Sequence, residues 1–260
     1  MEEVLLVEKR TSHLLIATLN RPLVKNAINI ELMTALKNFW QDLFIKSDDL
    51  RCIILTGAGD AFCAGADLKA RKNLSLIEWR MQHRVLEQAI LAMLDCPIPI
   101  IAAVNGAAFG GGLELMMCCD FAYAVEDATF SQSEVKWGLM PGATGTQQLP
   151  RTVGLSRAKE LAFTGRIFDA KTAHAWGMIN QVVSSNQLLD HVIDVAKQIA
   201  ENAPLAIQQV KKAMNMSGQL DLKSGFWYEL TAYDQLLTTK DRAEGIAAFN
   251  AKRKPIFTGE

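Results

Sequence analysis

Residues 105–114 place three consecutive glycines directly before an expected helix that opens with a carboxylate. The segment reads Asn105-Gly106-Ala107-Ala108-Phe109-Gly110-Gly111-Gly112-Leu113-Glu114. Glycines let a ligand approach the main chain closely, and the first turn of a helix presents unpaired N–H groups that attract negative charge. A second carboxylate, Glu134, follows just ahead of Gly138-Leu139-Met140-Pro141-Gly142. Two carboxyl groups that face one site can divide acid and base work between them.

These features also have a purely structural interpretation. Gly110 to Gly112 can form only a tight strand-to-helix turn, and a glutamate in the first turn of a helix is commonly a capping or surface residue. Residues 57–59 lack the third glycine of a dinucleotide loop, and the four histidines are scattered without metal-ligand spacing. The glycine segment alone therefore leaves the structural and the catalytic interpretations open.

The bulk composition indicates a globular enzyme. The chain has 260 residues, of which half are apolar and 21% are charged, and its formal net charge is −1. Near-neutral charge argues against nucleic acid or an anionic membrane as the main partner, and no apolar run reaches the length of a membrane span. The five cysteines form an odd set without CxxC spacing among apolar neighbours, so we expect reduced, buried thiols in a cytoplasmic protein.

Strands and helices alternate through about residue 135, which predicts an α/β architecture with strands buried on both faces. Ser75 and Glu78 have the spacing of a capping box at the start of one helix. The pattern predicts a hairpin at 4–8 and 14–19, strands at 52–55, 100–104, 121–124 and 128–131, and helices at 30–45, 75–94 and 113–117.

The remainder of the chain is mostly helical. We expect the last helices to bury their apolar faces on the main domain or on another subunit, because no strand in the sequence is left to pair with them. The predicted helices are 157–164, 169–176, 187–202, 204–215, 220–239 and 241–252, with one strand at 178–183.

Several segments together resemble the crotonase superfamily, the enoyl-CoA hydratase/isomerase family. They occur in the family's order and span nearly the whole chain. They are Phe62-Cys63-Ala64-Gly65-Ala66-Asp67-Leu68-Lys69, Asn105 to Glu114, Glu134 to Gln147 with its Pro141-Gly142-Ala143-Thr144-Gly145 turn, and Asp241-Arg242-Ala243-Glu244-Gly245 with Phe249 and Lys252-Arg253. The resemblance implies a crotonase-type spiral of ββα units with a helical C-terminal trimerisation region.

The resemblance also implies roles for individual residues. The main-chain N–H groups of Ala66 and Gly111 would stabilise a thioester oxyanion, and Glu114 and Glu134 would hold one water between them. For Gly111 the helix start supports the same role independently. Further residues would contact the substrate or its CoA group, Phe249 and Lys252 from a neighbouring subunit. These residues are Ala64, Asp67, Leu68, Lys69, Arg71, Gly110, Pro141, Gly142, Phe249 and Lys252.

Both glutamates together favour hydration of a short-chain trans-2-enoyl-CoA to a 3-hydroxyacyl-CoA. Isomerases and decarboxylases of the family often lack one of them, and both remain alternatives. Cys63 and the segments at 113–115 and 239–242 resemble the methylglutaconyl-CoA hydratase branch. Arg71 could then face a terminal carboxylate instead of a CoA phosphate, and Trp79, Trp137 and Leu139 are candidates for the acyl pocket.

The resemblance implies no metal and no redox cofactor, since CoA arrives as part of the substrate. It implies a homo-oligomer, a trimer or a dimer of trimers, with residues 1–195 as the catalytic core and 196–260 as the oligomerisation region. RNA binding is a distant alternative from another class of function. It is disfavoured because Lys37 is the single lysine in residues 30–45.

Overall fold

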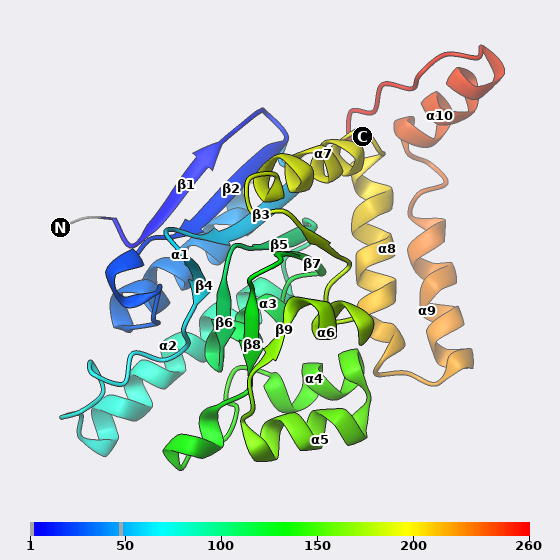
Figure 1. The fold of residues 1–260 in the computed structure, drawn as a ribbon. Helices are drawn as coiled ribbons and strands as arrows, with labels where there is room; N and C mark the ends of the chain where they lie inside the picture. Colours follow the sequence, from blue (N-terminus) through cyan, green and yellow to red (C-terminus); the bar gives the residue numbers. More distant parts are fainter. Residues whose placement is uncertain (1–2, 47–48) are drawn as a thin grey trace.

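The computed structural model describes residues 3–46 and 49–260, which form two sheets wrapped by helices (Figure 1). The larger sheet has the order β1-β2-β3-β5-β7-β10, in which β1 and β2 are antiparallel and the other neighbours are parallel. Its strands are β1 Leu5–Lys9, β2 Leu14–Leu19, β3 Cys52–Gly57, β5 Ile100–Val104, β7 Phe121–Val125 and β10 Gln181–Val183. The smaller sheet has the order β4-β6-β8-β9, with strands β4 Ala61–Cys63, β6 Ala107–Phe109, β8 Thr129–Ser131 and β9 Phe168–Asp169.

The chain winds as a spiral that gives one strand to each sheet before it enters a helix. β3 and β4 precede α2 (Leu76–Leu94), and β5 and β6 precede α3 (Gly111–Met117). β7 and β8 then precede a short 3-10 helix, η2 (Glu134–Trp137). This repeat confirms the expected α/β spiral of ββα units.

The central strands are apolar because both of their faces are covered. All five residues of β5 are buried, whereas four of the five residues of the edge strand β1 are exposed. α7 (Leu188–Ala200) packs across the larger sheet, and α1 (Ile30–Lys46) packs against α2. The remaining helices of this part are η1 Pro22–Val24, α4 Gly145–Val153, α5 Leu155–Thr164 and α6 Ala170–Ala175. All five cysteines are buried and unpaired, as expected.

Local sequence signals placed most boundaries within two residues. The hairpin pairs Leu5 with Leu19, and the capping box forms because the Ser75 hydroxyl accepts from the Glu78 amide at 3.2 Å while the Ser75 amide donates to the Glu78 carboxylate at 2.8 Å. Two predictions were wrong. The strand predicted at 178–183 is only β10, because Met178 N–H bonds Ala173 in the turn that ends α6. The long helix predicted at 220–239 ends early as α9 (Leu222–Asp234).

The last helices stand at one side of the molecule (Figure 1). α8 (Pro204–Ser217) and α9 pack against each other, and α10 (Lys240–Asn250) follows. Lys211 ties α8 to the core through Asp120 and the Ile98 carbonyl, both at 2.8 Å. Much apolar surface stays uncovered in the single chain, including Met214, Leu222, Phe226, Trp227, Ile246 and Phe249. The division at residue 195 stays a prediction; α7 runs across that position and packs on the sheet.

No helix among residues 3–46 and 49–260 has the length and apolar character needed to cross a bilayer.

Asn26 holds together the segments that lead from the larger sheet to the smaller one. Its side chain is fully buried and its backbone is left-handed, with φ of 55°. The amide nitrogen donates to the carbonyls of Ala58 and Ala61 at 2.9 and 2.8 Å and to that of Phe62 at 3.2 Å, and the amide oxygen accepts from the Arg21 N–H at 2.8 Å. One side chain thus binds four main-chain groups from separate segments of the chain.

Replacing Asn26 with alanine should therefore be costly. Asn26→Ala leaves several buried main-chain groups without partners, and we expect the free energy of unfolding to fall by about 2–4 kcal/mol. Asn202→Ala, which removes one exposed bond to the Gln198 carbonyl, is the matched control and should change it by less than about 1 kcal/mol. Urea titration at fixed protein concentration measures both; equal effects would refute the role given to Asn26.

Candidate active site

Glu114 is a buried carboxylate held by main-chain amides. It lies in the first turn of α3, and only 2% of its surface is exposed. Its Oε1 atom accepts from the N–H groups of Ala143 and Gly145 at 2.8 and 2.7 Å. Burial raises the pKa of Glu114 to about 7; these amide donors oppose the shift, and the charge of Glu134 adds to it. Glu114 can therefore both gain and lose a proton near neutral pH.

Glu134 is held by one neighbouring side chain. It begins η2, and Gln132 Nε2 donates to both of its carboxylate oxygens at 3.0 Å. Gln132 itself is 1% exposed. Gly110 lies against the same carboxylate: its φ is +50°, and a Cβ atom there would sit 2.9 Å from Glu134 Oε1. Glycine at position 110 is therefore required both for the turn and for the space that Glu134 occupies.

The two carboxyl groups belong to one site, with Gln132 between them. A Cβ atom on Gly145 would lie 2.8 Å from Glu114 Oε1 and 3.0 Å from Gln132 Oε1, so these two oxygens face the same small space. The other end of the Gln132 amide binds Glu134. No role was predicted for Gln132. The only signal in the sequence for such a role is its position two residues before Glu134.

Two main-chain amides converge beside this site. In the bridge between Ile28 and Ala66, Ile28 N–H bonds the Gly65 carbonyl at 2.7 Å and its carbonyl accepts from Asp67 N–H at 3.0 Å. The N–H of Ala66 consequently points away from Ile28. Gly111 lies close to this loop: its amide nitrogen is 3.2 Å from the position of a Cβ on Gly65, and Ala66 N is 4.0 Å from the position of a Cβ on Gly111. Within the described ranges neither Ala66 nor Gly111 finds an acceptor for its N–H.

An ion pair between Arg21 and Asp67 stabilises the loop that carries Ala66. Arg21 Nη1 binds Asp67 Oδ2 at 3.0 Å and also donates to the Ala27 carbonyl. Burial alone would raise the pKa of Asp67, but hydrogen bonds from Ala70 and Arg21, with the Arg21 charge, bring it below its usual value. Asp67 thus positions the loop with its side chain. Ala64, at the start of the loop, donates its N–H to the Lys25 carbonyl at 2.9 Å.

The segment after the loop carries the predicted cations. Leu68 and Lys69 are exposed, whereas Arg71 is half-buried with its guanidinium 5.9 Å from the Trp79 ring centroid. Burial lowers the pKa of Arg71 below its usual value. Trp79 stacks on His83 with centroids 4.9 Å apart, and the His83 ring meets Gly142, where a Cβ would lie 3.0 Å from its Cε1 atom.

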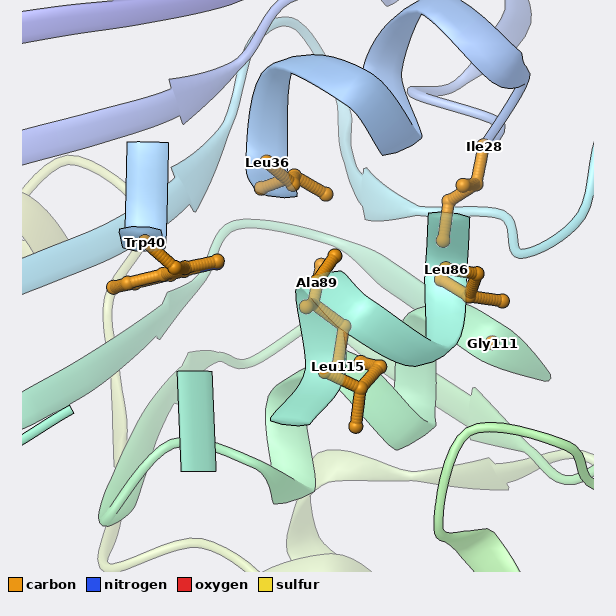
Figure 2. A pocket seen from close by; sticks show the side chains of 8 residues that line it. Ile28, Leu36, Trp40, Leu86, Ala89, Gly111 and Leu115 are labelled. Carbon is orange, nitrogen blue, oxygen red and sulfur yellow. The ribbon is translucent and has the colours of Figure 1, made fainter. Parts of the chain in front are cut away.

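Arg71, Trp79, His83 and Gly142 thus form a row of contacts, which leads from Arg71 to the loop that binds Glu114. Gly142 immediately precedes Ala143, and Pro141 beside it is buried. A small apolar pocket lies where α1, α2 and α3 meet, and Gly111 adjoins it (Figure 2). Its walls are Ile28, Leu36, Trp40, Leu86, Ala89, Ile90 and Leu115.

Two predicted residues lie away from the site in this chain. Phe249 is 84% exposed on α10 and Lys252 is exposed just beyond it, at the opposite side of the molecule from α2 (Figure 1). Trp137 and Leu139 stay beside the second glutamate: both are exposed on and after η2, and Leu139 N–H bonds the Glu134 carbonyl at 3.1 Å. Within the described part of the chain no cluster of His, Cys, Asp and Glu has the arrangement of a metal site.

Comparison with known proteins agrees with this architecture. The sequence model of the enoyl-CoA hydratase/isomerase family matches residues 9–260. A crystal structure of an enoyl-CoA hydratase from Bacillus anthracis superposes with a TM-score of 0.96 at 39% identity, covering 99% of this chain and 100% of that one. Crotonyl-CoA hydratase from Syntrophomonas wolfei is 38% identical over 98% of each chain.

Human mitochondrial methylglutaconyl-CoA hydratase is 37% identical, over 98% of this chain and 76% of that protein. A family match over nearly the whole chain, relatives well above 30% identity and a shared fold all agree. The chain belongs to the enoyl-CoA hydratase/isomerase family.

Proposed function

We propose that the protein is an enoyl-CoA hydratase, which adds water across the double bond of a short-chain trans-2-enoyl-CoA to give a 3-hydroxyacyl-CoA. The observation that carries the proposal is the convergence of two carboxyl groups, with Gln132 bound to Glu134 and facing the Glu114 side, beside two amides that lack acceptors. Hydration needs a base for the water and an acid for Cα, and it needs donors for a developing oxyanion. This site contains candidates for all of them.

The chemistry follows from the positions of these groups. Water attacks Cβ of the enoyl thioester and gives a proton to Glu114, while the electron pair of the double bond moves toward the thioester oxygen. The N–H groups of Ala66 and Gly111 stabilise the enolate oxygen, a contribution typically worth about 3–4 kcal/mol per donor. Glu134 then delivers its proton to Cα. The pair begins and ends with one proton, which must return from Glu114 to Glu134 before the next turnover.

An isomerase or decarboxylase on the same scaffold is the alternative. A double-bond shift requires one group that moves a proton between two carbons, and decarboxylation requires none that activates water. The second carboxylate, Glu134, therefore favours hydration. Product analysis with a 3-enoyl-CoA and with a malonyl-type CoA separates these reactions. The near-neutral charge of the chain continues to disfavour RNA binding.

Arg71 supports 3-methylglutaconyl-CoA as a candidate substrate. Its guanidinium is partly desolvated, and the row through Trp79 and His83 leads from it to the loop that binds Glu114. A partly desolvated guanidinium suits a carboxylate at the end of the acyl group, and the nearby charge of Asp67 favours its protonated form. The human methylglutaconyl-CoA hydratase relative is consistent with this specificity.

The CoA part of the substrate would lie along the exposed edge of the site, near Ala64, Leu68, Lys69 and Gly110, with Pro141 and Gly142 at its acyl end. We propose a trimer or a dimer of trimers, because the apolar faces of α8 to α10 lack cover and because Phe249 and Lys252 need a neighbour's site to act. No cofactor beyond CoA enters the proposed reaction, and a cytoplasmic location remains part of the proposal.

Removing either carboxylate should remove most turnover. We expect Glu114→Gln and Glu134→Gln each to lower kcat for crotonyl-CoA hydration by about 10²–10⁴-fold, since general acid–base groups contribute on that scale. Glu126→Gln, at an exposed turn after β7, is the matched control and should leave kcat unchanged. The loss of enoyl thioester absorbance measures all three. Turnover within tenfold of wild type in either variant would refute the assignment.

The raised pKa of Glu114 predicts the pH dependence. Because turnover needs the Glu114–Glu134 pair to carry one proton and the pKa of Glu114 is about 7, kcat/KM should follow a bell-shaped profile with one limb near pH 7, falling about tenfold per pH unit beyond it. The comparison uses crotonyl-CoA in buffers of constant ionic strength. A profile that is flat from pH 5.5 to 8 would contradict the role of Glu114.

Substrate selection by Arg71 can be separated from CoA binding. Arg71→Met should lower kcat/KM for 3-methylglutaconyl-CoA by about 10- to 100-fold, the usual loss for a charge-assisted hydrogen bond, and should leave crotonyl-CoA within threefold. Arg80→Met, an exposed arginine of α2, is the control. Equal losses with both substrates would show instead that Arg71 contacts CoA.

A further inference from the structure

The side-chain amide of Gln132 has one satisfied end and one unsatisfied end. Its Nε2 atom donates to both oxygens of Glu134 at 3.0 Å. Its Oε1 atom is buried and has no hydrogen-bond partner in the part of the chain that the structure describes. A buried amide oxygen without a donor is costly, so the site must supply one in some state of the enzyme.

Glu114 is the group placed to supply that donor. Gln132 Oε1 and Glu114 Oε1 both lie within about 3 Å of the Cβ position on Gly145, so they are no farther apart than the sum of those two distances. Glu114 Oε1 already accepts two amide hydrogens, which leaves Oε2 to carry a proton. A protonated Glu114 needs an acceptor for its O–H in this buried space, and Gln132 Oε1 is an acceptor that lacks a donor.

We propose that Gln132 is a positioning residue that couples the two glutamates, with its amide nitrogen toward the ionised carboxylate and its amide oxygen toward the protonated one. This inference rests on the proposed hydratase activity. In the structure the nitrogen faces Glu134 and the oxygen faces the Glu114 side, which is the arrangement for Glu134 ionised and Glu114 protonated. Rotation of the amide by half a turn fits the opposite arrangement.

The orientation of the Gln132 amide changes as the proton moves during the reaction. Before water adds, Glu134 carries the proton and donates it to the Gln132 oxygen, while the Gln132 nitrogen faces ionised Glu114. Water gives one proton to Glu114 and its hydroxide to Cβ, and Glu134 gives its proton to Cα. Each carboxyl has then exchanged its charge state, and the rotated amide satisfies both again. Gln132 itself gains and loses no proton at any step.

Few other titratable groups approach Glu114. Cys118 of α3 lies near it, but burial raises the pKa of that thiol to about 12, so it stays neutral. His83 of α2 meets Gly142 and faces Glu87 at 3.6 Å. Glu134 of η2 is the remaining neighbour, and Gln132 binds it directly. A change confined to Gln132 therefore acts on the glutamate pair.

The test replaces the amide with an apolar chain of similar length. In Gln132→Met, protonated Glu114 loses its acceptor, so we expect the limb of the kcat/KM profile near pH 7 to move down by about one pH unit. We also expect kcat to fall about tenfold or more while KM stays within threefold. Gln181→Met, an exposed glutamine of β10, is the control and should match wild type.

A second variant and a second measurement keep the result independent of folding and of turnover. Gln132→Glu keeps the shape but replaces the donor, so its activity should peak at a lower pH than wild type, where the added carboxyl is protonated. Infrared titration should show a protonated carboxyl band that is absent in Glu114→Gln and that titrates at lower pH in Gln132→Met. Thermal unfolding shows that each variant is folded.

The outcomes separate this inference from the proposed function. If wild type fails to hydrate any enoyl-CoA tested, the proposed function fails, and the infrared titration still decides the coupling. If wild type is a hydratase but the kinetic and infrared profiles of Gln132→Met keep their pH positions, Gln132 only fills space and the coupling is refuted.

Discussion

The buried carboxylate of Glu114 is the constraint on which the site depends. A carboxylate removed from water is tolerated only where donors replace its hydration, and here the loop at 142–145 turns its N–H groups onto one oxygen. That loop must stay small, because a Cβ on Gly145 would sit 2.8 Å from the same oxygen. The amide donors offset only part of the cost of burial, so the pKa of Glu114 is raised to about 7. This buried carboxyl group can therefore exchange a proton near neutral pH.

Side-chain amides of two asparagines hold the segments that lead to the site. Asn26 and Asn105 both bind the Ala61 carbonyl, and together they fix the passage from β3 to β4 that ends in the loop of Ala66. The spiral then brings α3 beside that loop, so an amide from each turn faces the same space. The proposed catalytic geometry is therefore distributed over segments distant in sequence, and the asparagines help to hold those segments together.

The sequence predicted those features that have a local signal. Hydrophobic periodicity located the buried strands and long helices, and the glycine run with Glu114 pointed to the helix start. The strands of the smaller sheet are two or three residues long, too short for any period, and only β8 was anticipated. The roles of Gln132, Asn26 and Asn105 were not predicted, because their partners come from other turns of the spiral or are backbone carbonyls. We predicted that the apolar faces of the last helices would need the main domain or another subunit to cover them, because no strand in the sequence was left to pair with them. α9 nevertheless ends earlier than its sequence pattern indicated.

The most direct test of the central claim is a crystal structure with a 3-ketoacyl-CoA, which resembles the substrate but lacks the double bond to hydrate. The account predicts that the thioester oxygen accepts hydrogen bonds from Ala66 N and Gly111 N at about 3 Å, with the carboxyl groups of Glu114 and Glu134 on either side of Cα and Cβ. A thioester bound away from these two amides, or glutamates that face separate cavities, would contradict it.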